Sequence, residues 1–115
     1  MNITIYQKPT CSTCRQVYNI LKESGVDFKV VNYYTEPLTE TKIRSLLKKM
    51  KMTPLELLRT KENIYKELHL EDEHFTDDEL IQYMITNPEL LQRPIAEKGA
   101  IAILARPAER IKEIL

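Results

Sequence analysis

The chain has 115 residues, of which 43% are hydrophobic and 30% charged, a composition typical of one globular domain. Its 17 lysines and arginines balance its 17 aspartates and glutamates, so the formal net charge is zero. This balance removes the bulk electrostatic attraction that non-specific binding to nucleic acid requires. A basic cluster, Lys48, Lys49 and Lys51, is interleaved with leucines and methionines, and we interpret it as the solvated face of a helix.

The segment Met1–Tyr6 carries neither the basic region nor the long apolar run of a secretory signal. No stretch of the sequence approaches the ~20 apolar residues that span a bilayer. We therefore expect a cytoplasmic protein that has no membrane contact and works where thiols are kept reduced.

The N-terminal third predicts a parallel β–α–β unit. Ile3 and Ile5 alternate with less apolar neighbours, as in a short half-buried strand. Residues 28–34 are rich in valine and aromatic side chains and predict a second strand, while Gly25 marks the end of the helix between the two. A crossover of this length joins parallel strands. The apolar positions of the helix recur at helical spacing: Cys14, Val17, Ile20 and Leu21.

Residues from about 39 to 88 predict a block of helices. Thr53–Glu56 combines an N-cap threonine, a proline at the first helical position and a glutamate that can close a capping box. Thr76–Glu79 is a second capping box, and the block ends at Asn87-Pro88. The first helix of the block has one apolar face, made of Ile43, Leu46, Leu47 and Met50.

The C-terminal part predicts a hairpin followed by a helix. Two short apolar runs, 94–97 and 100–104, are separated by Lys98-Gly99, which is a turn signal. The last helix begins at Pro107 and is expected to pack through Ile111, Ile114 and Leu115. The order of elements is therefore βαβ, helices, ββα, which is an α/β fold.

The only two cysteines, Cys11 and Cys14, lie between the first strand and the first helix. A structural disulfide between such close residues would close almost no loop and would stabilise little. If the helix begins near Cys11, its free N–H groups and its dipole favour the thiolate form of that sulfur. Cys14 lies one turn further on the same face, within reach of Cys11, and should be the less exposed thiol because it starts the apolar stripe.

We favour a redox or nucleophilic motif for this pair over two alternatives. Cys11 and Cys14 form a C-x2-C…H-x4-H set with His69 and His74, but the gap is far longer than in a zinc finger, and we expect no bound metal. The other alternative is a pair of buried core cysteines. Both histidines flank an acidic loop, Glu71–Glu73, and are expected to be non-catalytic surface residues.

Further motifs run in order through nearly the whole chain. They are Ile5-Tyr6-x-x-Pro9-x-Cys11, Leu57-Leu58-Arg59, Tyr65-x-Glu67-Leu68-x-Leu70, Phe75-Thr76-Asp77-Asp78, Asn87-Pro88-x-Leu90, Arg93-Pro94-Ile95 and Arg106-Pro107-x-Glu109. Together they resemble the glutaredoxin-dependent arsenate reductase family.

The resemblance implies a thioredoxin-like core, with the helical block of residues 39–88 inserted between the second and third strands of a single domain, residues 1–115. It also implies that the Cys11 thiolate attacks arsenate, and that glutathione and glutaredoxin supply the electrons. We accordingly expect glutathione as a co-substrate, no bound cofactor, no direct contact with nucleic acid and a monomeric chain.

The family's three active-site arginines fall on Arg59, Arg93 and Arg106. Guanidinium groups bind tetrahedral oxyanions through paired, charge-assisted hydrogen bonds, and they also stabilise a nearby thiolate. Pro94 matches the cis-proline that lies beside the catalytic cysteine in thioredoxin-like folds. Ser12 and Thr13, inside the cysteine motif, are candidate supporting residues.

Two departures from the family keep other functions open. Gln7 stands where these reductases commonly carry a histidine, so that histidine's role does not transfer. Cys14 is a candidate resolving cysteine, which would make thioredoxin a second possible electron donor. The same feature is similar to the Spx redox-sensing regulators, which bind RNA polymerase, and to general thiol–disulfide or glutathione-dependent reductases. Arg59 and Arg106 favour the arsenate reductase, because a plain disulfide reductase needs no oxyanion site.

Overall fold

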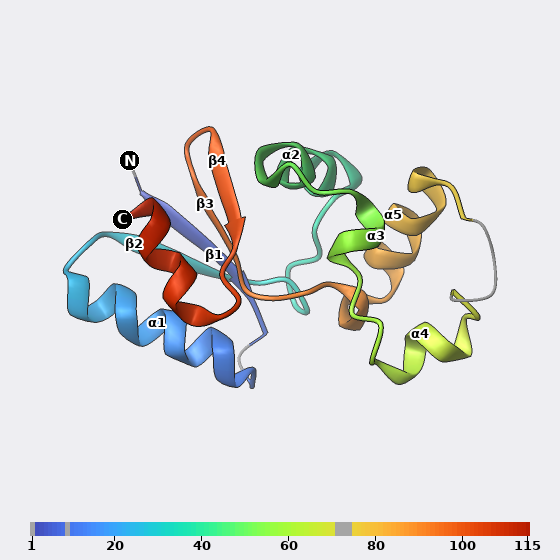
Figure 1. Cartoon of the computed structure of the whole chain (residues 1–115), viewed down its shortest axis with the longest axis horizontal. Coiled ribbons are helices and arrows are strands. Elements are labelled where there is room, and N and C mark those ends of the chain that lie inside the picture. Colours follow the sequence, from blue (N-terminus) through green and yellow to red (C-terminus); the bar gives the residue numbers. More distant parts are fainter. Residues whose placement is uncertain (1, 9, 71–74) are drawn as a thin grey trace. The chain divides into compact units, whose positions relative to one another are not determined.

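The computed structural model describes residues 2–8, 10–70 and 75–115 (Figure 1). The chain divides into two compact units. The first runs to Glu36 and resumes at Arg93–Leu115, and the second is Pro37–Gln92. The predicted helical block of residues 39–88 thus lies within the second unit.

The first unit is built on a four-stranded sheet of order β2-β1-β3-β4. β1 pairs with β2 in parallel and with β3 in antiparallel orientation, and β3 and β4 form an antiparallel hairpin. The predicted β–α–β unit and hairpin are therefore confirmed. The strands are β1 (Ile3–Gln7), β2 (Phe28–Asn32), β3 (Ile95–Lys98) and β4 (Ile101–Leu104).

The hairpin turn lies one residue later than the sequence predicts. Lys98 continues the ladder by pairing with Ile101, so the turn consists of Gly99 and Ala100. Gly99 takes a φ of 60°, a left-handed conformation that glycine adopts without a steric penalty.

The helix α1 (Ser12–Ser24) and the 3-10 helix η2 (Ala108–Ile114) pack with the sheet in one apolar core. α1 ends at Gly25, in the left-handed conformation with φ 78°, as predicted. The last element is a 3-10 helix, in which positions three apart share a face, so Ala108, Ile111 and Ile114 are buried. Leu115 lies off that face and is 44% exposed, so its predicted packing role is wrong.

The second predicted strand is shorter than expected, because Asn32 ends it. Its side-chain Oδ1 accepts a hydrogen bond from the Tyr34 N–H at 3.0 Å, and its carbonyl accepts one from the Thr35 N–H at 3.1 Å. Such turns made by an asparagine compete with the strand ladder. Tyr33 thereby leaves the strand while its side chain remains only 2% exposed.

The described part of the second unit consists of helices joined by short connections, as predicted, with one isolated antiparallel bridge between Leu58 and Leu91. The side chains of Thr53 and Thr76 both close capping boxes, with Glu56 and Glu79 respectively. The block extends slightly beyond its predicted end, because Pro88 opens a 3-10 turn, a position that proline tolerates. The helices are α2 (Glu40–Met50), α3 (Pro54–Leu57), α4 (Asn63–Glu67), α5 (Asp77–Thr86) and the 3-10 helix η1 (Pro88–Leu90).

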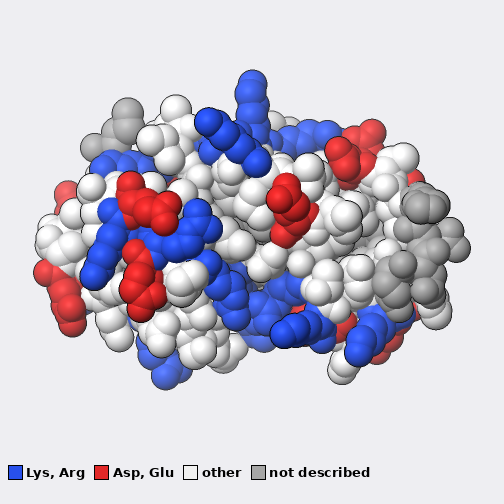
Figure 2. Space-filling model, in the orientation of Figure 1, with Lys and Arg blue, Asp and Glu red and all other residues white. Residues whose placement is uncertain are grey.

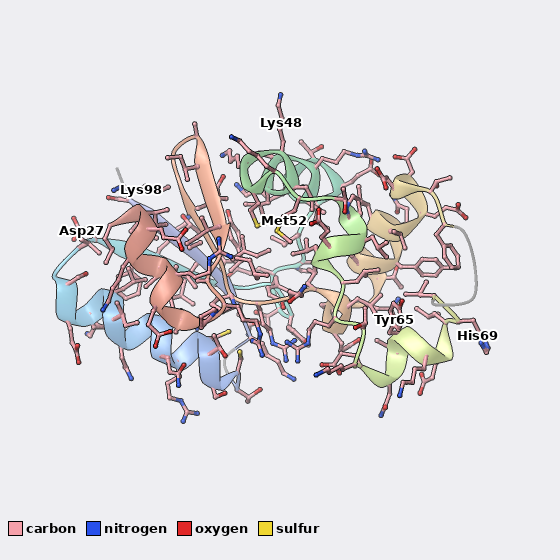
Figure 3. All side chains as sticks on the ribbon, in the orientation of Figure 1. Asp27, Lys48, Met52, Tyr65, His69 and Lys98 are labelled. Carbon is pink, nitrogen blue, oxygen red and sulfur yellow. The ribbon has the colours of Figure 1, made fainter. Side chains whose placement is uncertain are left out.

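The charged surface agrees with the balanced composition. Basic and acidic side chains both appear on the face shown in Figure 2. Lys48 is exposed and points away from α2 (Figure 3), whereas Lys49 is half-buried and the exposed Lys51 caps the end of the helix, so the prediction of a solvated helix face holds in part. Among the described residues, no helix is both long and apolar enough to cross a membrane.

Candidate functional site

Cys11 caps the N-terminus of α1. Its backbone is extended, and its Sγ accepts a hydrogen bond from the Cys14 N–H at 3.3 Å, while its carbonyl accepts one from the Arg15 N–H at 3.1 Å. The loop before it is closed by a hydrogen bond from the Cys11 N–H to the Lys8 carbonyl at 3.1 Å. The predicted placement of this sulfur against the free N–H groups of a helix is therefore confirmed.

The surroundings of Cys11 favour its thiolate. Burial by itself would raise the pKa of Cys11, but the Cys14 side chain and N–H group both hydrogen-bond to its sulfur, and Arg93 adds a positive charge and a further hydrogen bond. The net result is a pKa of Cys11 below its ordinary value. A thiolate is the reactive form of cysteine, so this sulfur is the candidate nucleophile.

Cys14 has the opposite character. Burial, followed by its hydrogen bond to Cys11, raises the pKa of Cys14 to about 12. Its side chain is 1% exposed, against 9% for Cys11, which confirms the predicted difference in exposure. Both cysteines are free thiols. Cys11 is thus the thiol that ionises more readily, whereas Cys14 stays protonated and donates a hydrogen bond to the Cys11 sulfur.

Arg93 is the charged group of the site. Its side chain is 7% exposed, and its Nε and Nη1 atoms have no hydrogen-bond partner among the described residues. Burying a guanidinium with unused donors is costly unless an anion pairs with it. The Arg93–Pro94 peptide bond is cis, as the family resemblance implied for Pro94.

The Arg106 side chain contacts the backbone of Arg93. The Arg106 Nη1 donates a hydrogen bond to the Arg93 carbonyl at 3.1 Å, and the Ala105 N–H donates one to the Pro94 carbonyl at 2.9 Å. The Arg106–Pro107 peptide bond is also cis. Arg106 is exposed. Its remaining donors leave it able to contact a bound anion, while one of them already fixes the chain at Arg93.

The structure brings Cys11, Cys14, Arg93, Pro94 and Arg106 into the first unit. The candidate supporting residues Ser12 and Thr13 form the first turn of α1, Ser12 exposed and Thr13 half-buried.

Arg59 belongs to the second unit. Its Nε donates to Glu62 Oε1 at 2.9 Å, and its N–H donates to the Leu90 carbonyl at 2.7 Å. Its role in an oxyanion site stays a prediction.

Gln7, the position of the family's histidine, ends β1. It is half-buried, and its Oε1 has no hydrogen-bond partner among the described residues. An amide cannot take up and release a proton near neutral pH as histidine does, so no acid–base role is assigned here.

Tyr33, which follows β2, is a residue of the site that the sequence did not indicate. It is buried and hydrogen-bonded to Arg93. Parallel strands bring their carboxyl ends to the same edge of a sheet, and β1, which leads to Cys11, pairs with β2 at Gln7 and Asn32. The signal that could have identified it is the pair of tyrosines, Tyr33 and Tyr34, at the carboxyl end of the second strand of a predicted parallel pair.

The second histidine of the zinc alternative, His74, and the acidic loop Glu71–Glu73 lie outside the described residues. His69 is exposed at the end of α4 (Figure 3), with a φ of 55°. No group of three or more histidine, cysteine, aspartate or glutamate residues suited to a metal ion occurs in the part of the chain that the structure describes.

The mixed sheet of order β2-β1-β3-β4, the helix-capping cysteine and the cis-proline before β3 define a thioredoxin-like fold with a candidate thiol site. Residues 6–114 match the model of the ArsC family, and the chain belongs to this family.

Among its relatives, the Escherichia coli K12 protein named YfgD is 42% identical over 114 residues, which cover 98% of this chain and 96% of that protein. The arsenate reductase of the same strain is 37% identical over 114 residues, covering 99% of this chain and 81% of that protein. The solved structure of arsenate reductase from Vibrio cholerae superposes with a TM-score of 0.94 at 32% identity, covering 100% of this chain and 98% of that one.

The difference between the two thiols is directly measurable. In the Cys14→Ser variant, where a serine hydroxyl can still donate to Cys11, the rate of alkylation should rise with pH through a midpoint below the ordinary thiol range. The rate follows the thiolate fraction, so the lowered pKa of Cys11 moves its onset to lower pH. A midpoint at the ordinary value of about 8.5 would contradict this interpretation.

Proposed function

We propose that this protein is an arsenate reductase whose nucleophile is Cys11. The observation that carries the proposal is the buried Arg93 guanidinium, which holds two unused donors beside a sulfur whose pKa is lowered. A tetrahedral oxyanion would satisfy those donors and place its central atom near the thiolate. The relatives named as arsenate reductases support arsenate as that oxyanion.

In the first step, the Cys11 thiolate attacks the arsenic atom of dihydrogen arsenate. A sulfur–arsenic bond forms, one arsenate oxygen leaves as water with the two protons of the dihydrogen arsenate, and arsenic remains pentavalent. Arg93 neutralises the charge on the remaining oxygens, which is the role of a preorganised cation in such a step. Arg59 and Arg106 are assigned to the same task by the family resemblance.

In the second step, a thiol attacks the Cys11 sulfur. With glutathione, a mixed disulfide forms, the sulfur–arsenic bond breaks, and its electron pair leaves on arsenic, which becomes trivalent arsenite. Glutaredoxin and further glutathione then reduce the mixed disulfide in the reducing cytoplasm. Glutathione is thus a co-substrate that needs no permanent site on the protein.

Cys14 offers a second route for the same step. Its attack on the Cys11 sulfur would give an internal disulfide, and an intramolecular thiol has a high effective concentration. Burial is the largest cause of the raised pKa of Cys14, and the hydrogen bond to Cys11 and the charge of Cys11 add to it. The hydrogen bond to the thiolate and the thiolate charge both end once the Cys11 sulfur is bonded to arsenic, whereas burial remains. Thioredoxin could then serve as the electron donor.

The test is steady-state arsenate reduction, with glutathione plus glutaredoxin and with thioredoxin plus its reductase supplied separately. Wild type should turn over with both systems, and Cys14→Ser only with the first. Mass spectrometry of the oxidised wild type should show a Cys11–Cys14 disulfide. Finding glutathionylated Cys11 with a free Cys14 thiol would exclude the Cys14 route and retain only the glutathione route. Cys14 would then be a packing residue.

The adjacent pair of free thiols also fits a second function, a redox-sensing module that binds RNA polymerase. No arsenate turnover with either donor system, together with polymerase binding that changes when the thiols are oxidised, would favour this module. Turnover of a simple disulfide without any arsenate reduction would favour a general thiol–disulfide reductase.

A further inference from the structure

Tyr33 is a buried polar side chain that belongs neither to the cysteine motif nor to the residues used in the proposed mechanism. It lies in the turn that Asn32 forms after β2 and is 2% exposed. Its ring packs against that of Tyr34, with centroids 5.2 Å apart, and the Lys8 Nζ lies 5.2 Å from the centre of the Tyr34 ring. Because Lys8 belongs to the loop that leads to Cys11, the two tyrosines adjoin the thiol loop.

The buried hydroxyl of Tyr33 has a partner in the site. The Arg93 guanidinium donates a hydrogen bond to it, and the same guanidinium donates to the Cys11 sulfur. A buried phenol normally needs such a partner, because an unpaired hydroxyl in the interior is costly. Arg93 therefore connects Tyr33 with the nucleophile.

The two ends of Arg93 are held by different residues. Its backbone is fixed through the hydrogen bond from Arg106 to its carbonyl at 3.1 Å. An arginine side chain nevertheless has many rotamers, and fixing it costs conformational entropy. An acceptor with a rigid ring and a buried position is well suited to select one of these rotamers.

We propose that Tyr33 is a positioning residue, whose hydroxyl holds the Arg93 guanidinium against Cys11 and leaves its unused donors available to an oxyanion. The holding of Arg93 beside the thiolate is independent of the substrate, whereas the presentation of donors to arsenate rests on the proposed function. Tyr33 acts through Arg93 and has no contact with the reacting atoms in this assignment.

The first experiment needs no arsenate. The Tyr33→Phe variant removes one oxygen and keeps the ring, and peptide mass spectrometry reports the alkylation of Cys11 alone. We expect the midpoint of the pH profile to rise and the rate at pH 7 to fall by about ten-fold, the effect of losing one charge-assisted hydrogen bond. Tyr18→Phe, which removes an exposed hydroxyl from α1, is the matched control and should leave the profile unchanged.

A double-mutant cycle separates positioning from packing. In an Arg93→Met background, Tyr33→Phe should have no further effect on Cys11, because the group through which it acts is gone. An equal effect in both backgrounds, or a midpoint that falls in Tyr33→Phe, would overturn the proposal. In turnover assays Tyr33→Phe should also raise KM for arsenate. If the alkylation shift appears without any arsenate turnover in the wild type, the positioning role stands and the proposed function fails.

Discussion

Replacing Cys11 by serine should reduce arsenate turnover by at least about 10⁴-fold, because loss of a covalent nucleophile removes the reaction path itself. A serine hydroxyl ionises far above neutral pH, and its oxygen cannot enter a disulfide exchange. The fold should persist, since serine is a good N-cap and can accept the hydrogen bond that the Cys14 N–H now donates to sulfur at 3.3 Å. Steady-state and single-turnover assays, together with a thermal melt, test both statements.

The matched control for this variant is Cys14→Ser. It keeps the Cys11 sulfur and should retain turnover with glutathione and glutaredoxin, whereas Cys11→Ser should be inactive with every donor. Substantial turnover by Cys11→Ser would place the nucleophile elsewhere and would end the proposed mechanism. A lower melting temperature in Cys11→Ser alone would show that the sulfur contributes more to the helix terminus than an ordinary N-cap does.

Replacing Arg93 by methionine should separate activity from stability. Loss of one preorganised group at a developing oxyanion costs about 10²- to 10³-fold in turnover. Arg93 is buried with two unused donors. Replacing this charge by an apolar side chain of similar length removes the cost of burying two unused donors, but it leaves the Tyr33 hydroxyl without its donor. Because the two effects oppose each other, we expect a melting temperature close to that of wild type.

Arg15→Met is the matched control, because Arg15 is an exposed arginine of α1, and neither assay should change. Arg106→Ala should also impair turnover, through lost contact with the oxyanion and through release of the Arg93 carbonyl. If Arg93→Met melts well below wild type while its specific activity is retained, Arg93 is a structural residue and the oxyanion site must be sought elsewhere.

Local patterns in the sequence predicted most of the elements and the position of Cys11 at the start of a helix. Helix caps, turns and the spacing of apolar residues depend on neighbours within a few positions, so Gly25 and the capping boxes at Thr53 and Thr76 were correctly placed. The N-cap position of Cys11 and the burial of Cys14 are of the same kind, since both follow from where one helix begins.

The tertiary structure alone decided what surrounds that sulfur. Strand pairing of β1 with β2 and β3 brings the turn at Tyr33 and the chain at Arg93 to the first unit's thiol loop from distant parts of the sequence. Spacing along the chain carries no information on such a meeting, and it showed neither that Arg93 is buried nor that Arg106 donates to its carbonyl. Long-range packing decides which polar groups are removed from water. Because Arg93 and Tyr33 are both buried, each needs a hydrogen-bond partner inside the protein, and they pair with each other.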